Sequence, residues 1–251
     1  MDASALLTHA VFIGLTFVLA GFVKGVVGLG LPTVAVGLLG LVMPPVQAAA
    51  LLVAPSMVTN VVQLMSGPRF GALVRRLWPM LAGIVVGTLA VAAIVPAGAV
   101  VHATTALGVA LILYALVGLF SVKLEVARGT ERWLSPWVGL VTGGITAVTG
   151  VFVIPAVPFL QGIGLEKEEL VQALGLSFTI STVALAISLA FGGALLHGPV
   201  VSASLLALPP ALAGMWLGQK LRHRIAARTF RRCFFVGLLV LGGELALRGL
   251  R

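Results

Sequence analysis

The chain has 251 residues, of which 60% are hydrophobic and 9% are charged, and its formal net charge is +9. A soluble domain carries about 25% charged residues, so this composition excludes that class and predicts an integral membrane protein. The arginines stand in short clusters between long apolar runs, as in cytoplasmic loops, which argues against a nucleic-acid partner.

Few residues are of the types that catalysis or metal binding requires. The single cysteine, Cys233, excludes an internal disulfide, and no Cys/His grouping has metal-ligand spacing. No Ser/His pair and no pair of carboxylates within an apolar segment points to catalysis. We therefore expect no cofactor, no metal site and no enzymatic activity. The first apolar run begins near Leu6 without a preceding basic region, so a cleaved signal peptide is not expected.

Eight apolar segments follow one another along the chain, most of them near the roughly 20 residues that a spanning helix needs. They are 6–43, 46–65, 77–95, 100–122, 133–160, 170–191, 200–217 and 230–247. The first is too long for one span, and 133–160 is rich in Gly, Thr and Pro. We expect an all-α polytopic membrane protein in which each of these two segments is a helical hairpin broken by glycine or proline.

The two halves of the chain resemble each other. The matching residues are, in chain order, Gly21 with Gly139, Gly25 with Gly143, Gln47 with Gln172, Ser56 with Ser181, Pro79 with Pro210 and Gly83 with Gly214. We therefore predict two homologous transmembrane repeats, 1–122 and 133–251, joined by a cytoplasmic linker at 123–132. Internal duplication of this kind is typical of secondary transporters.

Positive charge indicates how the repeats are oriented. The loop that contains Arg69, Arg75 and Arg76, the linker 123–132 and the segment 220–232 should all be cytoplasmic. This requires an even number of crossings between the linker and the segment 220–232, whereas a simple count gives three. The conflict disappears if 133–160 enters the membrane and returns, with a break near residues 149–150. We therefore expect inverted repeats.

Lys24 is the only lysine or arginine deep inside an apolar segment. Its long stem would let the ammonium reach the membrane interface, which is the simpler interpretation. About a dozen apolar residues precede it, however, and a glycine-rich break follows it directly, so we favour a functional role. In that role Lys24 supplies positive charge to an anionic substrate. Its counterpart in the second repeat is Thr142.

The break after Lys24 contains Gly25, Gly28, Gly30 and Pro32. Glycines permit close backbone approach, and Pro32 can begin a half-helix whose free N–H groups and positive dipole end suit an anion. The alternative is close packing of helices through small residues. The counterpart residues in the second repeat are Thr146, Thr149 and Gly150. Because both halves carry such a cluster, we favour a binding site.

Polar side chains in the helices that follow form a second group. Ser56 and Asn60 share one helix face, as do Ser177 and Ser181. Serines in membrane helices usually bond their own backbone, but an amide such as Gln63 needs a partner. The candidate substrate-binding residues are Lys24, Gly25, Gly28, Gly30, Pro32, Ser56, Asn60, Gln63, Thr142, Thr146, Thr149, Gly150, Ser177 and Ser181.

The glycine motif at 21–30, its degenerate copy at 139–155 and the duplicated layout resemble the TauE/SafE sulfite exporter family over nearly the whole chain. The resemblance implies a multi-pass permease of the bacterial inner membrane for sulfite, sulfoacetate or other small organosulfur anions. Where the family often has a run of glycines, this chain has Leu31-Pro32 and Thr149-Gly150, so a small carboxylate stays open as substrate.

These observations together predict a secondary transporter that works by alternating access. Its expected partners are a small anionic substrate and the lipid bilayer, with a homo-oligomer as a further option. Three alternatives remain at this point: an anion channel, a carboxylate transporter and, less favoured, a membrane subunit that does not transport.

Overall fold

The computed structural model describes residues 3–95, 102–120, 125–195, 198–222, 224 and 226–249, and all regular elements in them are helices. The helices are α1 Ala3–Val27, α2 Leu31–Leu39, α3 Pro45–Leu64, α4 Phe70–Ile94, α5 Ala103–Leu119, α6 Arg128–Thr149, α7 Ala156–Gly162, α8 Lys167–Phe191, α9 Gly198–Leu206, α10 Leu208–Leu221 and α11 Ala227–Arg248. Five helical stretches are long and apolar enough to cross a membrane. The prediction of an all-α polytopic membrane protein is confirmed.

Both unusual apolar segments are broken where the glycines lie. The first divides into α1 and α2 at Gly28 and Gly30, whose φ angles of 81° and 104° favour glycine. Pro32 stands in the first turn of α2, where its missing N–H costs no hydrogen bond. The second ends α6 at Gly150, which has φ 71°, and resumes as α7. The arms of each hairpin are unequal, with 25 and 9 residues in the first and 22 and 7 in the second.

Two helices, α4 and α6, begin earlier than the predicted apolar segments 77–95 and 133–160. Arg75 and Arg76, expected in a loop, lie in the first two turns of α4, where Arg75 is exposed and Arg76 pairs with Glu131 of α6. The linker 123–132 is helical from Arg128 onward. The predicted apolar segment 200–217 lies within the membrane-length stretch Val200–Leu221, which is divided only at Ala207, since the prolines at the start of α10 lack the N–H groups that would continue α9.

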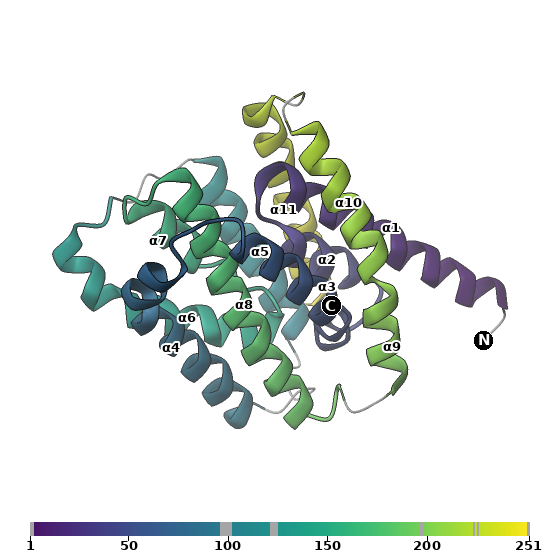
Figure 1. Ribbon diagram of the computed structural model, residues 1–251. Coiled ribbons are helices and arrows are strands. Elements are labelled where there is room, and N and C mark those ends of the chain that lie inside the picture. Colours follow the sequence, from purple (N-terminus) through teal and green to yellow (C-terminus); the bar gives the residue numbers. More distant parts are fainter. Residues whose placement is uncertain are drawn as a thin grey trace.

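Glycines set the closest helix contacts. A Cβ at Gly21 would meet the carbonyl oxygen of Ala211, and one at Gly25 that of Met215, so α1 and α10 run parallel with their backbones touching. The corresponding contacts between α6 and α4 are Gly139 with Met80 and Gly143 with Ile84. Figure 1 shows α4, α6 and α7 on one side of the molecule and α1, α9 and α10 on the other.

The central helices α3 and α8 run antiparallel. A Cβ at Gly175 would meet the backbone nitrogen of Leu64 at 2.5 Å, and the hydroxyls of Ser56 and Thr182 are 3.2 Å apart. Residue numbers therefore rise along one helix as they fall along the other. The same relation holds between α5 and α11. These two pairs lie between the parallel pairs.

One end of the molecule carries most of the positive charge and all four tryptophans. The tryptophan side chains are exposed and stand close in sequence to arginine or lysine at the ends of α4, α6 and α10, and the Lys220 ammonium lies 5.0 Å from the ring centre of Trp216. Tryptophan and basic residues together mark a membrane interface. We name this the basic end of the molecule.

The hairpin of α6 and α7 begins and finishes at the basic end. The backbone N–H of Val126 donates to the carbonyl of Gly162 at 2.9 Å, which joins the residues before α6 to the end of α7. The Arg76 guanidinium binds both carboxylate oxygens of Glu131, at 2.7 and 2.8 Å, and the carbonyl of Ile163. The chain therefore leaves this end along α6 and returns to it before α8.

Candidate functional site

The Lys24 ammonium lies inside the protein. Its side chain is 2% exposed, and Nζ donates hydrogen bonds to Thr59 Oγ1, at 3.1 Å, and to Asn60 Oδ1. Both acceptors belong to α3, which runs beside the last turn of α1. This geometry opposes the interpretation in which Lys24 reaches the membrane interface.

Asn60 extends the contact from α3 to α8. Its Nδ2 donates to Ser56 Oγ at 3.0 Å and to Thr182 Oγ1 at 3.1 Å. The hydroxyls of Thr59 and Thr182 each donate to the backbone carbonyl four residues earlier in the same helix. Their oxygens can therefore accept the hydrogen bonds from Lys24 and Asn60. We call Lys24, Ser56, Thr59, Asn60 and Thr182 the polar cluster. It joins one helix of the first hairpin to the two central helices.

Charge within the polar cluster is not balanced. The ion pairs Arg69–Glu169, Arg76–Glu131 and Arg248–Glu244 do not include Lys24. Its hydrogen-bond partners are a hydroxyl and an amide, which carry no net charge. A buried charge without an opposite charge is unfavourable, so the cluster presents a site that an anion would stabilise.

Unpartnered polar atoms lie on the same helices. Within the described part of the chain, Gln63 Oε1, Ser177 Oγ and Ser181 Oγ are buried and have no hydrogen-bond partner. Most buried polar atoms in proteins are paired, so such atoms call for an explanation. All three lie on α3 or α8, which also carry the polar cluster. Within the same described part, Thr88, Thr105 and Tyr114, on α4 and α5, also carry buried oxygens without a partner, so these atoms do not by themselves mark a ligand site.

The tip of the first hairpin is held next to these helices. Gln63 Nε2 donates to the carbonyl of Gly28 at 3.0 Å, and Thr33 Oγ1 donates to the carbonyl of Gly30 at 3.0 Å. Both glycines have positive φ. The Gln63 amide nitrogen, which the sequence predicted to need a partner, therefore finds one in a backbone carbonyl of the tip.

The other predicted residues are not brought into the polar cluster. Gly25 packs against α10, which supports the small-residue alternative at that position. The hydroxyls of Thr142, Thr146 and Thr149 each donate to a carbonyl of their own helix at 2.7 Å. Gly150 caps α6 and packs against α3. Threonine in a helix readily bonds the carbonyl four residues back, which explains why these residues stay within α6.

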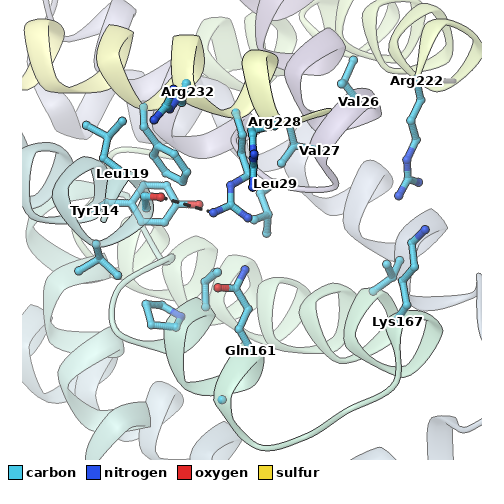
Figure 2. A pocket seen from close by; sticks show the side chains of 18 of the residues that line it. Val26, Val27, Leu29, Tyr114, Leu119, Gln161, Lys167, Arg222, Arg228 and Arg232 are labelled. Carbon is cyan, nitrogen blue, oxygen red and sulfur yellow. Dashed lines mark hydrogen bonds between the residues drawn. The ribbon is translucent and has the colours of Figure 1, made fainter. Parts of the chain in front are cut away.

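A cavity of about 1650 Å³ opens at the basic end. Val26, Val27 and Leu29 from the tip of the first hairpin form part of its wall. Its charged lining residues are Glu125, Lys167, Glu168, Arg222, Arg228, Arg231 and Arg232. We call it the basic cavity. Figure 2 shows Arg222 and Lys167 pointing toward each other from opposite walls.

None of the described residues predicted as binding residues lines the basic cavity. The arginines of α11 and the end of α10 belong to the basic segment 220–232, from which the sequence predicts topology but no anion site. Thr59 and Thr182 belong to the second group of polar side chains in the sequence but were not among the candidate binding residues. Nothing in their spacing distinguishes them from threonines that bond only their own helix.

Comparison with known proteins gives one match. Residues 13–245 match the family described as sulfite exporter TauE/SafE. The chain therefore belongs to this family of membrane transporters, and the resemblance seen in the sequence is confirmed. Searches of curated proteins and of solved structures each found no match.

Proposed function

We propose that this member of the sulfite exporter family is a secondary transporter for a small sulfur oxyanion, such as sulfite or a sulfonate, in the bacterial cytoplasmic membrane. The observation that carries the proposal is the buried Lys24 ammonium, which has only neutral partners among the described residues. An oxyanion bound there would balance the charge.

Two inverted repeats, one of which has lost its site, would account for the asymmetry of the polar cluster. Gln47 and Gln172 are counterparts in the two repeats. At the same offset in residue number, the counterparts of Thr59 and Asn60 are Ala184 and Leu185, which are buried and apolar. Lys24 itself corresponds to a threonine. The charge and both of its acceptors are therefore present only once, which favours one anion per molecule.

The directions of the helices support the inverted arrangement. Repeats related by a two-fold axis in the membrane plane place equivalent helices antiparallel to each other. The pairs α3 with α8 and α5 with α11 are equivalent under the proposed duplication, and both run antiparallel. The parallel pair α1 with α10 is likewise matched by the parallel pair α6 with α4.

Alternating access would use the tip of the first hairpin as a gate. Val26, Val27 and Leu29 face the basic cavity, whereas Lys24 lies behind them and is 2% exposed. In this conformation the polar cluster is separated from the cavity by apolar side chains. Displacement of the tip would break its hydrogen bond to Gln63 and open a path from the cavity to the ammonium.

The proposal is tested first by ligand stabilisation. Purified protein is heated with sulfite, sulfate, thiosulfate, sulfoacetate, taurine or simple carboxylates, and the melting temperature is measured for each. We expect saturable stabilisation by a sulfur oxyanion, because a ligand that binds only the folded state raises its stability. Preferential stabilisation by a carboxylate would change the substrate class. The absence of stabilisation by every anion would favour a subunit that does not transport.

Flux in proteoliposomes separates a carrier from a channel. A carrier saturates as its site fills and accumulates substrate when a coupling-ion gradient is applied, whereas flux through a channel follows the anion's own gradient. Saturable accumulation is expected here. Flux that never exceeds electrochemical equilibrium under any imposed ion gradient would support the channel.

The inverted arrangement has its own test. A reporter fused after Arg224, at the basic end, should be cytoplasmic, and one fused after Phe191, at the end of α8, should be periplasmic. The opposite pattern, or both reporters on one side, would refute it.

A further inference from the structure

We propose that the basic cavity is a second anion site, distinct from the polar cluster, which binds a small divalent oxyanion before it reaches Lys24. The inference rests on the proposed function, since it assumes that the same anion is later transported. It concerns residues that no family motif in this chain includes, and it assigns a role to the arginines beyond membrane topology.

The charge of the lining is the first argument. Among the described lining residues, five are basic and two are acidic, which leaves an excess of positive charge around one open cavity. The ion pairs Arg69–Glu169, Arg76–Glu131 and Arg248–Glu244 do not include Arg222, Arg228 or Lys167. A cleft with one sign of charge raises the local concentration of counter-ions and their rate of association.

The direction of the side chains is the second argument. Arg222 at the end of α10 and Lys167 at the start of α8 point toward each other across the opening, and Arg228 and Arg232 extend from α11 (Figure 2). Like charges that converge from separate helices repel each other, and a bound dianion would remove that repulsion. Guanidinium groups match oxyanions because they can donate two parallel hydrogen bonds.

The position of the cavity is the third argument. Its wall includes Val26, Val27 and Leu29, which follow Lys24 directly in the chain. An anion held by the arginines therefore waits on the cytoplasmic side of the gate proposed above. The tip would need to move only far enough to expose the ammonium behind it. Two successive basic sites would favour divalent oxyanions over monovalent anions such as chloride.

The test uses binding to the full-length protein in phosphatidylcholine nanodiscs, which contain no anionic lipid headgroup that could fill the cavity. Lys24→Met removes the charge of the deeper site, so sulfite or sulfate that still binds reports the cavity alone. In this background we compare Arg222→Gln with Arg224→Gln, a change of equal charge two residues away. Arg224 is exposed and is not among the described residues that line the cavity.

At about 20 mM ionic strength we expect Arg222→Gln to raise the dissociation constant for sulfate about threefold or more, and Arg224→Gln to leave it within about 1.5-fold. The difference should disappear near 1 M salt, where the Debye length is about 3 Å. Chloride at the same ionic strength should displace sulfate weakly.

Three results would overturn the inference. They are an equal effect of the two arginine substitutions, displacement of sulfate by an equal concentration of chloride, and no sulfate binding at all in the Lys24→Met protein. The proposed function fails by a different result, namely that Lys24→Met alone leaves anion affinity and flux at the wild-type level. The two proposals can therefore be separated.

Discussion

Replacement of Lys24 by methionine tests the centre of the proposed site. Methionine keeps the length and burial of the side chain but removes the ammonium and its hydrogen bonds to Thr59 and Asn60. Removal of an unbalanced buried charge stabilises the folded protein. Loss of the donor to the Asn60 side-chain oxygen destabilises it. These effects oppose each other, so the stability of the protein without ligand should change by about 1 kcal/mol or less.

Anion binding should respond much more strongly than stability. A hydrogen bond to a charged group contributes about 1.5 to 3 kcal/mol, and each 1.4 kcal/mol is a tenfold change in affinity. We therefore expect Lys24→Met to weaken sulfite binding about 10- to 100-fold and to reduce flux at subsaturating sulfite by a similar factor. The measurements are calorimetric titration of purified protein and initial flux in proteoliposomes.

Thr142→Ala is the matched control, because it alters the equivalent buried position of the second repeat. The Thr142 hydroxyl donates only to the carbonyl of Val138, and its loss should change sulfite affinity by about twofold or less. Equal losses in the two variants would show that Lys24 has no special role. Sulfite affinity in Lys24→Met within twofold of wild type would refute the reasoning directly.

Three further substitutions test the packing and the charges around the site. Asn60→Asp places a carboxylate beside the ammonium and should weaken sulfite binding at least tenfold without loss of thermal stability; unchanged binding would contradict this. Gly139→Ala places a Cβ on a backbone carbonyl of α4 and should destabilise the protein by about 1 to 3 kcal/mol, whereas Gly243→Ala, which meets open space, should be neutral or stabilising. Equal thermal shifts for these two would refute the packing argument. Glu131→Gln breaks a largely buried ion pair and should lower the free energy of unfolding by about 2 kcal/mol. Glu244→Gln breaks an exposed pair and should lower it by about 0.5 kcal/mol or less. A larger loss for Glu244→Gln than for Glu131→Gln in thermal unfolding would contradict this ranking of the two pairs.

Much of the fold could be predicted because a bilayer restricts what a chain can do. Apolar length predicts spanning helices, and the structure has five helical stretches of that kind. The orientation that the arginine clusters indicate stays a prediction. Both hairpin breaks were located correctly because glycine alone readily adopts the positive φ that Gly28, Gly30 and Gly150 show. Local backbone requirements of this kind can be read directly from residue type.

Helix ends were less predictable. The sequence placed Arg75 and Arg76 outside the membrane helix because arginine is costly in lipid. The helix extends over them because Arg76 finds Glu131 on α6, which is 55 positions away in the chain. That partner is set by the contact between α4 and α6, and no local pattern reveals it.

The sequence by itself determined that this chain is a membrane protein with broken helices and one lysine in an unusual place. Only the tertiary structure decided what Lys24 contacts, because Thr59 and Asn60 lie on another helix and Thr182 is 122 positions from Asn60. It also decided that the arginines of α10 and α11 surround a cavity beside the tip of the first hairpin. Residue type and period fix how each helix forms, whereas the partners of a side chain depend on how separate helices pack.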